Sequence, residues 1–515
     1  MLQYMRNEKS APYITTVFVS LFLSYLAVST DNLINHDGVY FMDAAKAFIR
    51  DGISVSFEVY NWPFYSWFVA VIHQLLWFDH FEQTAHLVNA IFIAATCAMF
   101  MRVYYEITDH QGSLVVAAVL ILTLVGINKY RADIMRDFAY WFFYLAGFYS
   151  LLSYYKKPKI LTAIGWQVLI GFAFLARIEG LAIILLGPLV LLMKNASLGQ
   201  RIIQVVALYG LYVVGALVVV VYLLFVDAAP VGISPGKLLH LGAYININSL
   251  VEAFNQDVLK MGTIFKYEGS KDRFYAFLGM LYAFTLMVYV LSKVVGCFSF
   301  PYFVLLCYGS LKKYVVLSEY NKIIIYFSSF LFLFFCIYII KGPVITPRYT
   351  TSLVFMLLLL LGQVVERLLP RISSRKNSRL ILVAVVLYLL LRTVDSVIST
   401  QGDSKTYILN AGYWVKENVD SSAAVYSNYY KAAYYTDRAA SEDSSMEFLE
   451  LMRAVENGSI GSRSYLIIKI EEDKAEMYMQ EITRLIAAKK IEHVIEFSNN
   501  DNDRAVIYNV VSSAK

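Results

Sequence analysis

The residue with the clearest chemical potential is Asp37, in a charged stretch that follows the first apolar segment of the chain. Gly38 comes directly after it and permits a sharp turn. Residues 40–50 are expected to form a short amphipathic helix, which Gly52 would end. A carboxylate held just outside a membrane can act as a general base toward an incoming nucleophile. The structural alternative is that Asp37 only caps this helix or is solvated in a loop.

A second short segment, residues 128–138, combines two acids with three bases. The acids are Asp133 and Asp137, and the bases are Lys129, Arg131 and Arg136. Local ion pairing would explain them, although exposed pairs contribute little to stability. The functional interpretation is a second carboxylate that faces the first across a cavity.

The third feature is a loop in which Arg348 and Tyr349 follow two prolines, Pro343 and Pro347. Arg348 comes where the next apolar segment begins, and an arginine there can bind a phosphate through two parallel hydrogen bonds. Snorkelling of the side chain to the membrane surface would account for the same position.

Two further charged segments adjoin apolar runs. Arg177 and Glu179 lie between two such runs and could simply pair with each other at the membrane surface. Residues 227–273 form a long segment with prolines and glycines, in which a surface helix is expected at about 247–262. A long segment over the mouth of a membrane site is typical of a lid.

These charges belong to a chain that is too apolar to be soluble throughout. Of its 515 residues, 58% are hydrophobic and only 16% are charged, whereas soluble domains carry about 25% charged residues. The composition excludes disordered, collagen-like and disulfide-stabilised proteins. The four cysteines lie in apolar segments without metal-ligand spacing. A polytopic membrane protein remains.

The elements that position the charged segments are membrane helices, each of which needs about 20 apolar residues. Two apolar segments, 62–78 and 299–317, are ambiguous, so the expected number of spans is about 11 to 13. The eleven expected spans are 12–30, 83–104, 113–128, 138–155, 159–176, 181–194, 203–226, 274–293, 322–341, 349–364 and 379–398.

Lysine and arginine set the expected orientation, because cytoplasmic loops are enriched in them. With the N-terminus inside and the two ambiguous segments on the surface or re-entrant, the most basic loops are cytoplasmic. The segments 31–82, 129–137, 177–180, 227–273 and 342–348 then all lie on the outer side.

The residues after position 400 have the pattern of a soluble domain outside the membrane. Strands are expected at 423–427, 465–470, 493–497 and 505–511, and helices at 445–455 and 474–489. The sequence therefore predicts a membrane domain at 1–400 and a small α/β domain at 401–515.

Taken together, the order of these features resembles the GT-C glycosyltransferases, particularly bacterial members similar to protein mannosyltransferases and the lipid A aminoarabinose transferase. The residues that carry the resemblance are Asp37, Pro63-Phe64-Tyr65, the segment from Arg131 to Asp137, Arg348-Tyr349, and the outer α/β tail. It covers essentially the whole chain and rests on order and topology. The chain departs from the family where Gly38 follows the Asp in place of Glu, and where Pro63 is the one proline in its helix.

The resemblance implies a polytopic helical membrane protein with a C-terminal α/β domain, in a bacterial inner membrane, that acts as an inverting glycosyltransferase. The donor would be a sugar on a polyprenyl phosphate, and the acceptor an extracytoplasmic lipid, glycan or protein. Asp37 would be the general base, with Asp137 or Asp133 as the second acid, and Arg348 and Lys341 would stabilise the phosphate. Further phosphate candidates are Arg131, Arg136 and Lys266, and the expected sugar or acceptor contacts are His36, Tyr40, Tyr65, Tyr349 and Glu179.

Three other classes are possible. A transporter or lipid flippase would place ionisable residues near the bilayer midplane, often with repeat symmetry. A glycan polymerase would need no separate soluble tail, and a non-enzymatic anchor would not explain the charges in the short outer loops. No cofactor is expected, and a divalent metal is not expected to be required because the acids do not cluster at ligand spacing. No nucleic-acid partner is expected.

Overall fold

The computed structural model describes residues 10–31, 33–76, 78, 80–108, 113–225, 246–265, 271–342, 344–373, 378–398, 405–437 and 446–511. The chain divides into two compact units. The first comprises Met1–Ala27 and Phe41–Ile398, and the second comprises Val28–Tyr40 and Ser399–Lys515. The sequence does not predict that Val28–Tyr40 packs with the tail.

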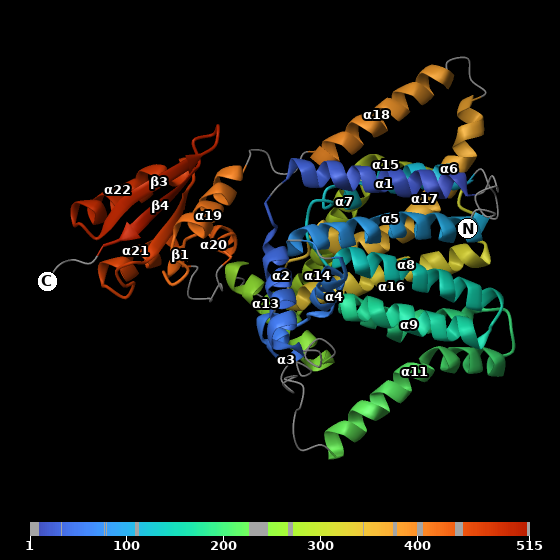
Figure 1. Ribbon diagram of the computed structural model, residues 1–515. Helices are drawn as coiled ribbons and strands as arrows, with labels where there is room; N and C mark the ends of the chain where they lie inside the picture. Colours follow the sequence, from blue (N-terminus) through green and yellow to red (C-terminus); the bar gives the residue numbers. More distant parts are fainter. Residues whose placement is uncertain are drawn as a thin grey trace. The chain divides into compact units, whose positions relative to one another are not determined.

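The first unit is helical, and most of its long helices run roughly parallel to one another (Figure 1). Its helices are α1 (Ala11–Thr30), α3 (Ile53–Val59), α4 (Phe64–Leu76), α5 (Phe81–Thr108), α6 (Ser113–Leu122), α7 (Val125–Asn128), α8 (Asp137–Lys156), α9 (Ile160–Ala176), α10 (Glu179–Leu186), α11 (Leu198–Phe225), α13 (Ile247–Phe265), α14 (Lys271–Phe298), α15 (Phe300–Leu311), α16 (Glu319–Lys341), α17 (Thr351–Ser373) and α18 (Ser378–Ile398). Two 3₁₀ helices, η1 (Gly187–Met193) and η2 (Pro347–Thr350), adjoin α10 and α17, and α2 (His36–Asp51) begins in the second unit.

Six of the described helices are long and apolar enough to cross a membrane. They are Ala11–Thr30, Phe81–Thr108, Leu198–Leu217, Arg273–Phe298, Glu319–Lys341 and Pro347–Ile372. Phe64–Leu76, Ser113–Leu122, Ile160–Ala176, Glu179–Met193 and Phe300–Leu311 are shorter apolar helices. Together with the small C-terminal sheet, these helices confirm the expected fold class.

Two expected spans are interrupted. The segment 113–128 contains α6 and α7, which are separate helices, and 181–194 contains α10 followed by η1. Pro188 lies at the start of η1 and lacks the amide proton that would continue an α-helix. The ambiguous segments 62–78 and 299–317 contain the short helices α4 and α15.

The helix α8 is the centre of the first unit and packs against both α5 and α9. Gly147 of α8 permits the close approach of α9, because a Cβ there would lie 2.3 Å from the Ile170 side chain. Gly362 of α17 faces the ring of Tyr104 on α5 in the same way, at 2.5 Å. Small residues at helix contacts of this kind let backbones approach closely.

The second unit contains a four-stranded sheet in the order β1-β2-β4-β3. The strands are β1 (Val425–Ser427), β2 (Tyr465–Ile470), β3 (Ile491–Ser498) and β4 (Arg504–Val510), and the helices are α19 (Thr406–Asn418), α20 (Tyr430–Tyr434), α21 (Phe448–Glu456) and α22 (Ala475–Ala487). The strands β1 and β2 are parallel, and the other two pairs are antiparallel. The six elements expected in the tail are present within a few residues, whereas α19 and α20 were not expected.

Helices cover both faces of this sheet (Figure 1). Leu466, Ile468 and Ile470 of β2 pack with α21 and α22, whereas Ile467 packs on the opposite face with α19 and α20. This alternation follows from the two-residue period of a strand. The second unit therefore has two hydrophobic layers, one on each side of the sheet.

The turn after β2 provides a test of the tail's stability. Glu471 accepts hydrogen bonds from the ammonium groups of Lys469 and Lys474, each at 2.5 Å, and these bonds lower its pKa from 4.5 to about 2. Because the folded-state pKa is lower than the unfolded one, the stabilisation is full above about pH 4.5 and is lost as the pH falls toward 2. We expect Glu471→Gln to cost less than about 1 kcal/mol at pH 7, since the group is partly exposed.

The difference in the free energy of unfolding between wild type and Glu471→Gln should shrink steadily as the pH is lowered from about 4.5 toward 2. Denaturant unfolding of the full-length protein, with protease cleavage of the tail as readout, measures it. Glu492→Gln, an exposed substitution on β3, is the control. A difference that stays constant down to pH 2 would contradict the assignment.

Candidate functional site

A buried ion cluster joins the ends of three consecutive helices in the first unit. α8 begins at Asp137, α9 ends directly before Arg177, and α10 begins at Glu179. Arg177 donates hydrogen bonds from Nη1 to Asp137, from Nη2 to Glu179, and from Nε to Glu179 at 3.0 Å. All three side chains are buried. The pair of Arg177 with Glu179 is thus bidentate, which fixes both side chains in one geometry.

The charges of this cluster are interdependent. Burial by itself would lower the pKa of Arg177, but the carboxylates of Asp137 and Glu179 raise it well above its ordinary value. The guanidinium therefore stays charged, and it is shared by two carboxylates. Removing one member of a buried ion pair leaves its partner as an uncompensated charge, which is strongly destabilising. The stability of each charged side chain in the cluster therefore depends on the other two.

Two arginines lie near the ring of Tyr349. The guanidinium of Arg177 is 4.2 Å from the ring centroid, and that of Arg348 is 5.6 Å from it. Both distances are within the range of cation–π attraction. The hydroxyl of Thr351 donates to the carbonyl of Arg348 at 2.8 Å, which fixes the turn η2 at the start of α17. Arg348 is consequently held beside the ion cluster.

The segment before α8 brings further predicted residues to this place. Arg348 Nη1 is 3.7 Å from the sulfur of Met135. Burial, with smaller contributions from Cys297, Asp133 and Asp137, raises the pKa of Tyr130 to about 12, and Arg348 opposes this shift. Tyr130 therefore remains a neutral phenol among charged groups. The structure thus gathers Asp133, Asp137 and Arg348 around Tyr130.

Polar contacts with α4 and α5 hold this segment in position. The Tyr65 hydroxyl donates to Asn89 Oδ1 at 2.8 Å, and Asn89 Nδ2 donates to the carbonyl oxygen of Asp133 at 3.1 Å. The guanidinium of Arg136 is 5.6 Å from the centroid of the Tyr60 ring. Tyr65, expected to contact the sugar or acceptor, is fully buried and acts on the site through Asn89.

Arg131 occupies a different environment from the one expected for a phosphate ligand. It is 1% exposed, and its guanidinium donates to Asn128, to Ser24 and to the carbonyl oxygen of Ser20 at 2.8–2.9 Å. Burial lowers its pKa to about 10. Arg131 therefore ties the segment before α8 to α1, and its expected contact with a phosphate stays a prediction.

Two lysines were expected near the phosphate. Lys341, at the end of α16, donates to the hydroxyl of Ser249 on α13 at 2.6 Å. This contact links the end of α16 to the surface helix expected at about 247–262, which the structure gives as α13. Lys266 and about half of the expected lid segment lie outside the described residues.

Asp37 belongs to the second unit and lies in the first turn of α2. The neighbouring ring of His36 packs edge-on against Tyr430 at 4.6 Å and against Tyr40 at 5.3 Å. The pKa of Tyr430 is raised, mainly by burial, and the negative charge of Asp37 makes a smaller contribution in the same direction. The expected helix stop is present, since Gly52 follows α2 with a φ of 89°. The assignment of Asp37 as general base stays a prediction.

Sequence reasoning missed the bridging role of Arg177. The pairing of Arg177 with Glu179 was one alternative, but its bond to Asp137 was not expected, nor was the approach of both Arg177 and Arg348 to the ring of Tyr349. Glu179, expected to contact the sugar or acceptor, has both carboxylate oxygens bound to Arg177. The available signal was that charges break the apolar pattern at 137 and again at 177–179, on the same expected side of the membrane.

In the described part of the chain, no group of three or more His, Cys, Asp and Glu side chains is arranged to hold a metal ion. The two carboxylates that lie close together, Asp137 and Glu179, already share a guanidinium. A divalent cation needs several oxygen ligands, so this donor set does not suit one.

Comparisons with solved structures identify the fold. The chain is similar to the Archaeoglobus fulgidus oligosaccharyltransferase in complex with Zn and sulfate, with a TM-score of 0.55, 13% identity, and coverage of 95% of this chain and 72% of that one. It is also similar to the same enzyme tethered to an acceptor peptide containing the NVT sequon, with a TM-score of 0.55, 11% identity, and coverage of 99% and 74%. No family model and no curated protein matches the sequence. The chain therefore has the GT-C fold, as the resemblance implied.

The ion cluster makes a prediction about stability. Arg177→Ala leaves two carboxylates buried without a counter-charge, so we expect it to lower the free energy of unfolding by about 3–5 kcal/mol. Combining Arg177→Met with Asp137→Asn and Glu179→Gln removes all three charges and should recover much of this loss. Thermal unfolding of the detergent-purified protein measures both. Arg136→Ala, which removes a stacking contact, is the control, and a single variant as stable as wild type would refute the prediction.

Proposed function

We propose that this protein is an inverting membrane glycosyltransferase that moves a sugar from a polyprenyl-phosphate donor to an extracytoplasmic acceptor. The observation that carries the proposal is the gathering of Arg348, Tyr349 and the Asp137–Arg177–Glu179 cluster at helix ends in a chain with the GT-C fold. The solved neighbours are oligosaccharyltransferases, and one of them carries an acceptor peptide. Both facts favour a transferase that moves a glycan to an acceptor. The proposed location is a bacterial inner membrane, with the site on the outer side.

The proposed reaction is a single displacement. The oxygen of an acceptor hydroxyl bonds to the anomeric carbon on the face opposite the phosphate, and its proton passes to the carboxylate of Asp37. The bond between the anomeric carbon and the phosphate oxygen breaks, and its electron pair leaves with the polyprenyl phosphate. His36 and Tyr40, on either side of Asp37 in α2, are the proposed acceptor contacts.

The leaving phosphate gains negative charge, so it needs a fixed cation. Arg348 is the proposed ligand because it lies in η2, directly before α17 and beside the buried ion cluster, and a guanidinium can bind two phosphate oxygens at once. Lys341 and Arg136 are proposed as further contributors to the electrostatic attraction. Tyr349 fixes the position of Arg348 relative to Arg177.

Asp137 is the proposed second acid, in preference to Asp133. Its carboxylate is buried and bound to Arg177, whereas Asp133 is half-buried and contacts Asn89 through its backbone carbonyl. In this role Asp137 keeps the cluster in one geometry while the donor binds and leaves. Preorganised charges of this kind favour a transition state without a cost in rearrangement.

The decisive experiment is a transfer assay with purified protein, radiolabelled polyprenyl-phosphate sugars, and lipid, glycan and peptide acceptors in separate reactions. Formation of a labelled acceptor in detergent, where no compartments exist, separates a transferase from a transporter or flippase. Activity that is unchanged after chelation is expected for the proposed metal-independent reaction. Label that stays on the polyprenyl phosphate with every acceptor would refute the proposed function.

Asp37→Asn is expected to lower kcat by about 10²–10⁴-fold, because the amide cannot accept the acceptor proton. Donor binding should be unchanged. The matched control is Asp51→Asn, which changes an exposed carboxylate at the other end of the same helix. Near-normal transfer by Asp37→Asn would remove the general base from the mechanism.

Arg348→Ala is expected to raise the KM for the polyprenyl-phosphate donor by about 10–100-fold, since it removes charge-assisted hydrogen bonds to the phosphate. Arg348→Lys should recover part of the loss. Arg367→Ala, an exposed substitution farther along α17, serves as the control. An effect on acceptor choice alone would show that Arg348 does not hold the phosphate.

A further inference from the structure

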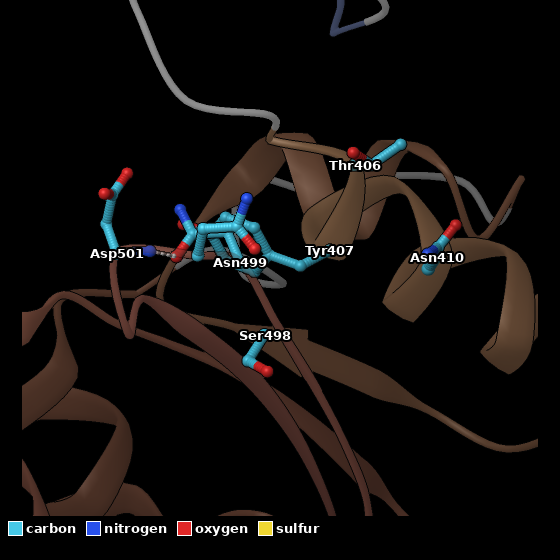
Figure 2. A pocket seen from close by; sticks show the side chains of 7 residues that line it. Thr406, Tyr407, Asn410, Ser498, Asn499 and Asp501 are labelled. Carbon is cyan, nitrogen blue, oxygen red and sulfur yellow. Dashed lines mark hydrogen bonds between the residues drawn. The ribbon is translucent and has the colours of Figure 1, made fainter.

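A polar cavity of about 240 Å³ lies in the second unit, at one end of the sheet (Figure 2). One wall is the beginning of α19, with Thr406, Tyr407 and Asn410. The other wall is Ser498, at the end of β3, and the turn that leads toward β4. None of the catalytic or phosphate-binding residues proposed above lines this cavity, so it is a separate feature of the tail.

The turn residues that line the cavity are Asn499, Asn500 and Asp501. Asn499 Oδ1 accepts the backbone N–H groups of Asp501 at 3.0 Å and of Asp503 at 2.9 Å. The first of these bonds is drawn in Figure 2, where Tyr407 also points from α19 toward Asn499. Asn499 therefore holds the turn in a fixed shape.

Three lining side chains remain available to a ligand. Thr406 and Asn410 are four residues apart on α19, so they lie one above the other on the same face of the helix. Asn500 is on the opposite wall. All three are exposed, and the described residues offer them no hydrogen-bond partner. They present hydroxyl and amide groups, which can both donate and accept.

The chemistry of the lining excludes several ligand classes. It contains no lysine or arginine, and its carboxylate, Asp501, opposes an anion such as phosphate. One carboxylate is too few for a divalent cation, which takes six or more oxygen ligands. The lining also contains no aliphatic side chain that would bind an acyl chain or an apolar peptide side chain.

We infer that this cavity binds one neutral sugar ring of a glycan. A pyranose presents several hydroxyl groups that donate and accept, which matches the amides and hydroxyls of the two walls. The volume is several times the roughly 30 Å³ occupied by one water. It is below the roughly 300–1,000 Å³ of sites for drug-sized ligands, which suits a single ring.

The inference deepens the proposed function and, as a role in catalysis, rests on it. A sugar ring held at the tail points to a glycan acceptor, because none of the residues proposed to hold the donor lines this cavity. The site would bind a unit of the acceptor away from the reacting one, and so act on acceptor affinity. Substitutions in the cavity should therefore raise the KM for the acceptor and leave kcat unaltered.

The test is saturation-transfer difference NMR on the full-length protein in detergent, with methyl pyranosides of mannose, glucose, galactose and N-acetylglucosamine as probes. At least one pyranoside should receive saturation from the wild type. The combined variant Asn410→Ala and Asn500→Ala should weaken this binding by roughly tenfold or more, since two hydrogen-bonding amides are lost. Asn418→Ala, an exposed substitution at the other end of α19, is the matched control and should bind as wild type does.

The outcomes separate this inference from the proposed function, because binding is read without transfer. Failure of every pyranoside to bind, or undiminished binding by the double variant, overturns the cavity assignment even if the protein is an active transferase. Binding of a neutral peptide in place of the pyranosides overturns it as well. Pyranoside binding that depends on Asn410 and Asn500 supports it, even in a protein that transfers no sugar.

Discussion

The sharing of one buried guanidinium by two carboxylates is the constraint on which the membrane unit depends. Arg177 binds Asp137 and Glu179, and its guanidinium faces the ring of Tyr349. Through these contacts a single cation fixes the start of α8, the end of α9 and the start of α10 relative to η2, which precedes α17. These charges are buried in an apolar unit where water cannot stabilise them. The protein itself must therefore supply their hydrogen bonds and counter-charges. Arg348 owes its position to this arrangement.

The fold class follows from the sequence because it depends on patterns that are local. Apolar length predicts the membrane helices, and the alternation in Tyr465–Ile470 places a strand whose two faces pack on different helices. The helices α19 and α20 were not predicted. With five residues, α20 is too short to display a helical period. The sheet order is also not local, since β4 lies between β2 and β3.

The candidate site was predicted in its residue types and only partly in its contacts. Asp137 and Arg177 are separated by 40 positions, and they meet because Gly147 lets α9 pack closely on α8. Nothing local to either residue encodes that approach. Arg131 illustrates the converse, because its charge suggested a ligand contact while its neighbours Ser20 and Ser24 lie more than 100 positions earlier. A short charged segment therefore predicts that a site exists better than it predicts which charge faces a ligand.

The segment Val28–Tyr40 makes the two units inseparable as modules. The chain passes from one unit to the other at 27/28, at 40/41 and at 398/399. Leu33 is partly buried against the core of the second unit, and Ile34 is buried and donates its backbone N–H to the hydroxyl of Tyr435 at 2.8 Å. A tail truncated or exchanged at a single point near residue 399 would be separated from the segment Val28–Tyr40, which also contains Asp37. The tail and the segment Val28–Tyr40 should consequently diverge together in evolution, as one inherited unit.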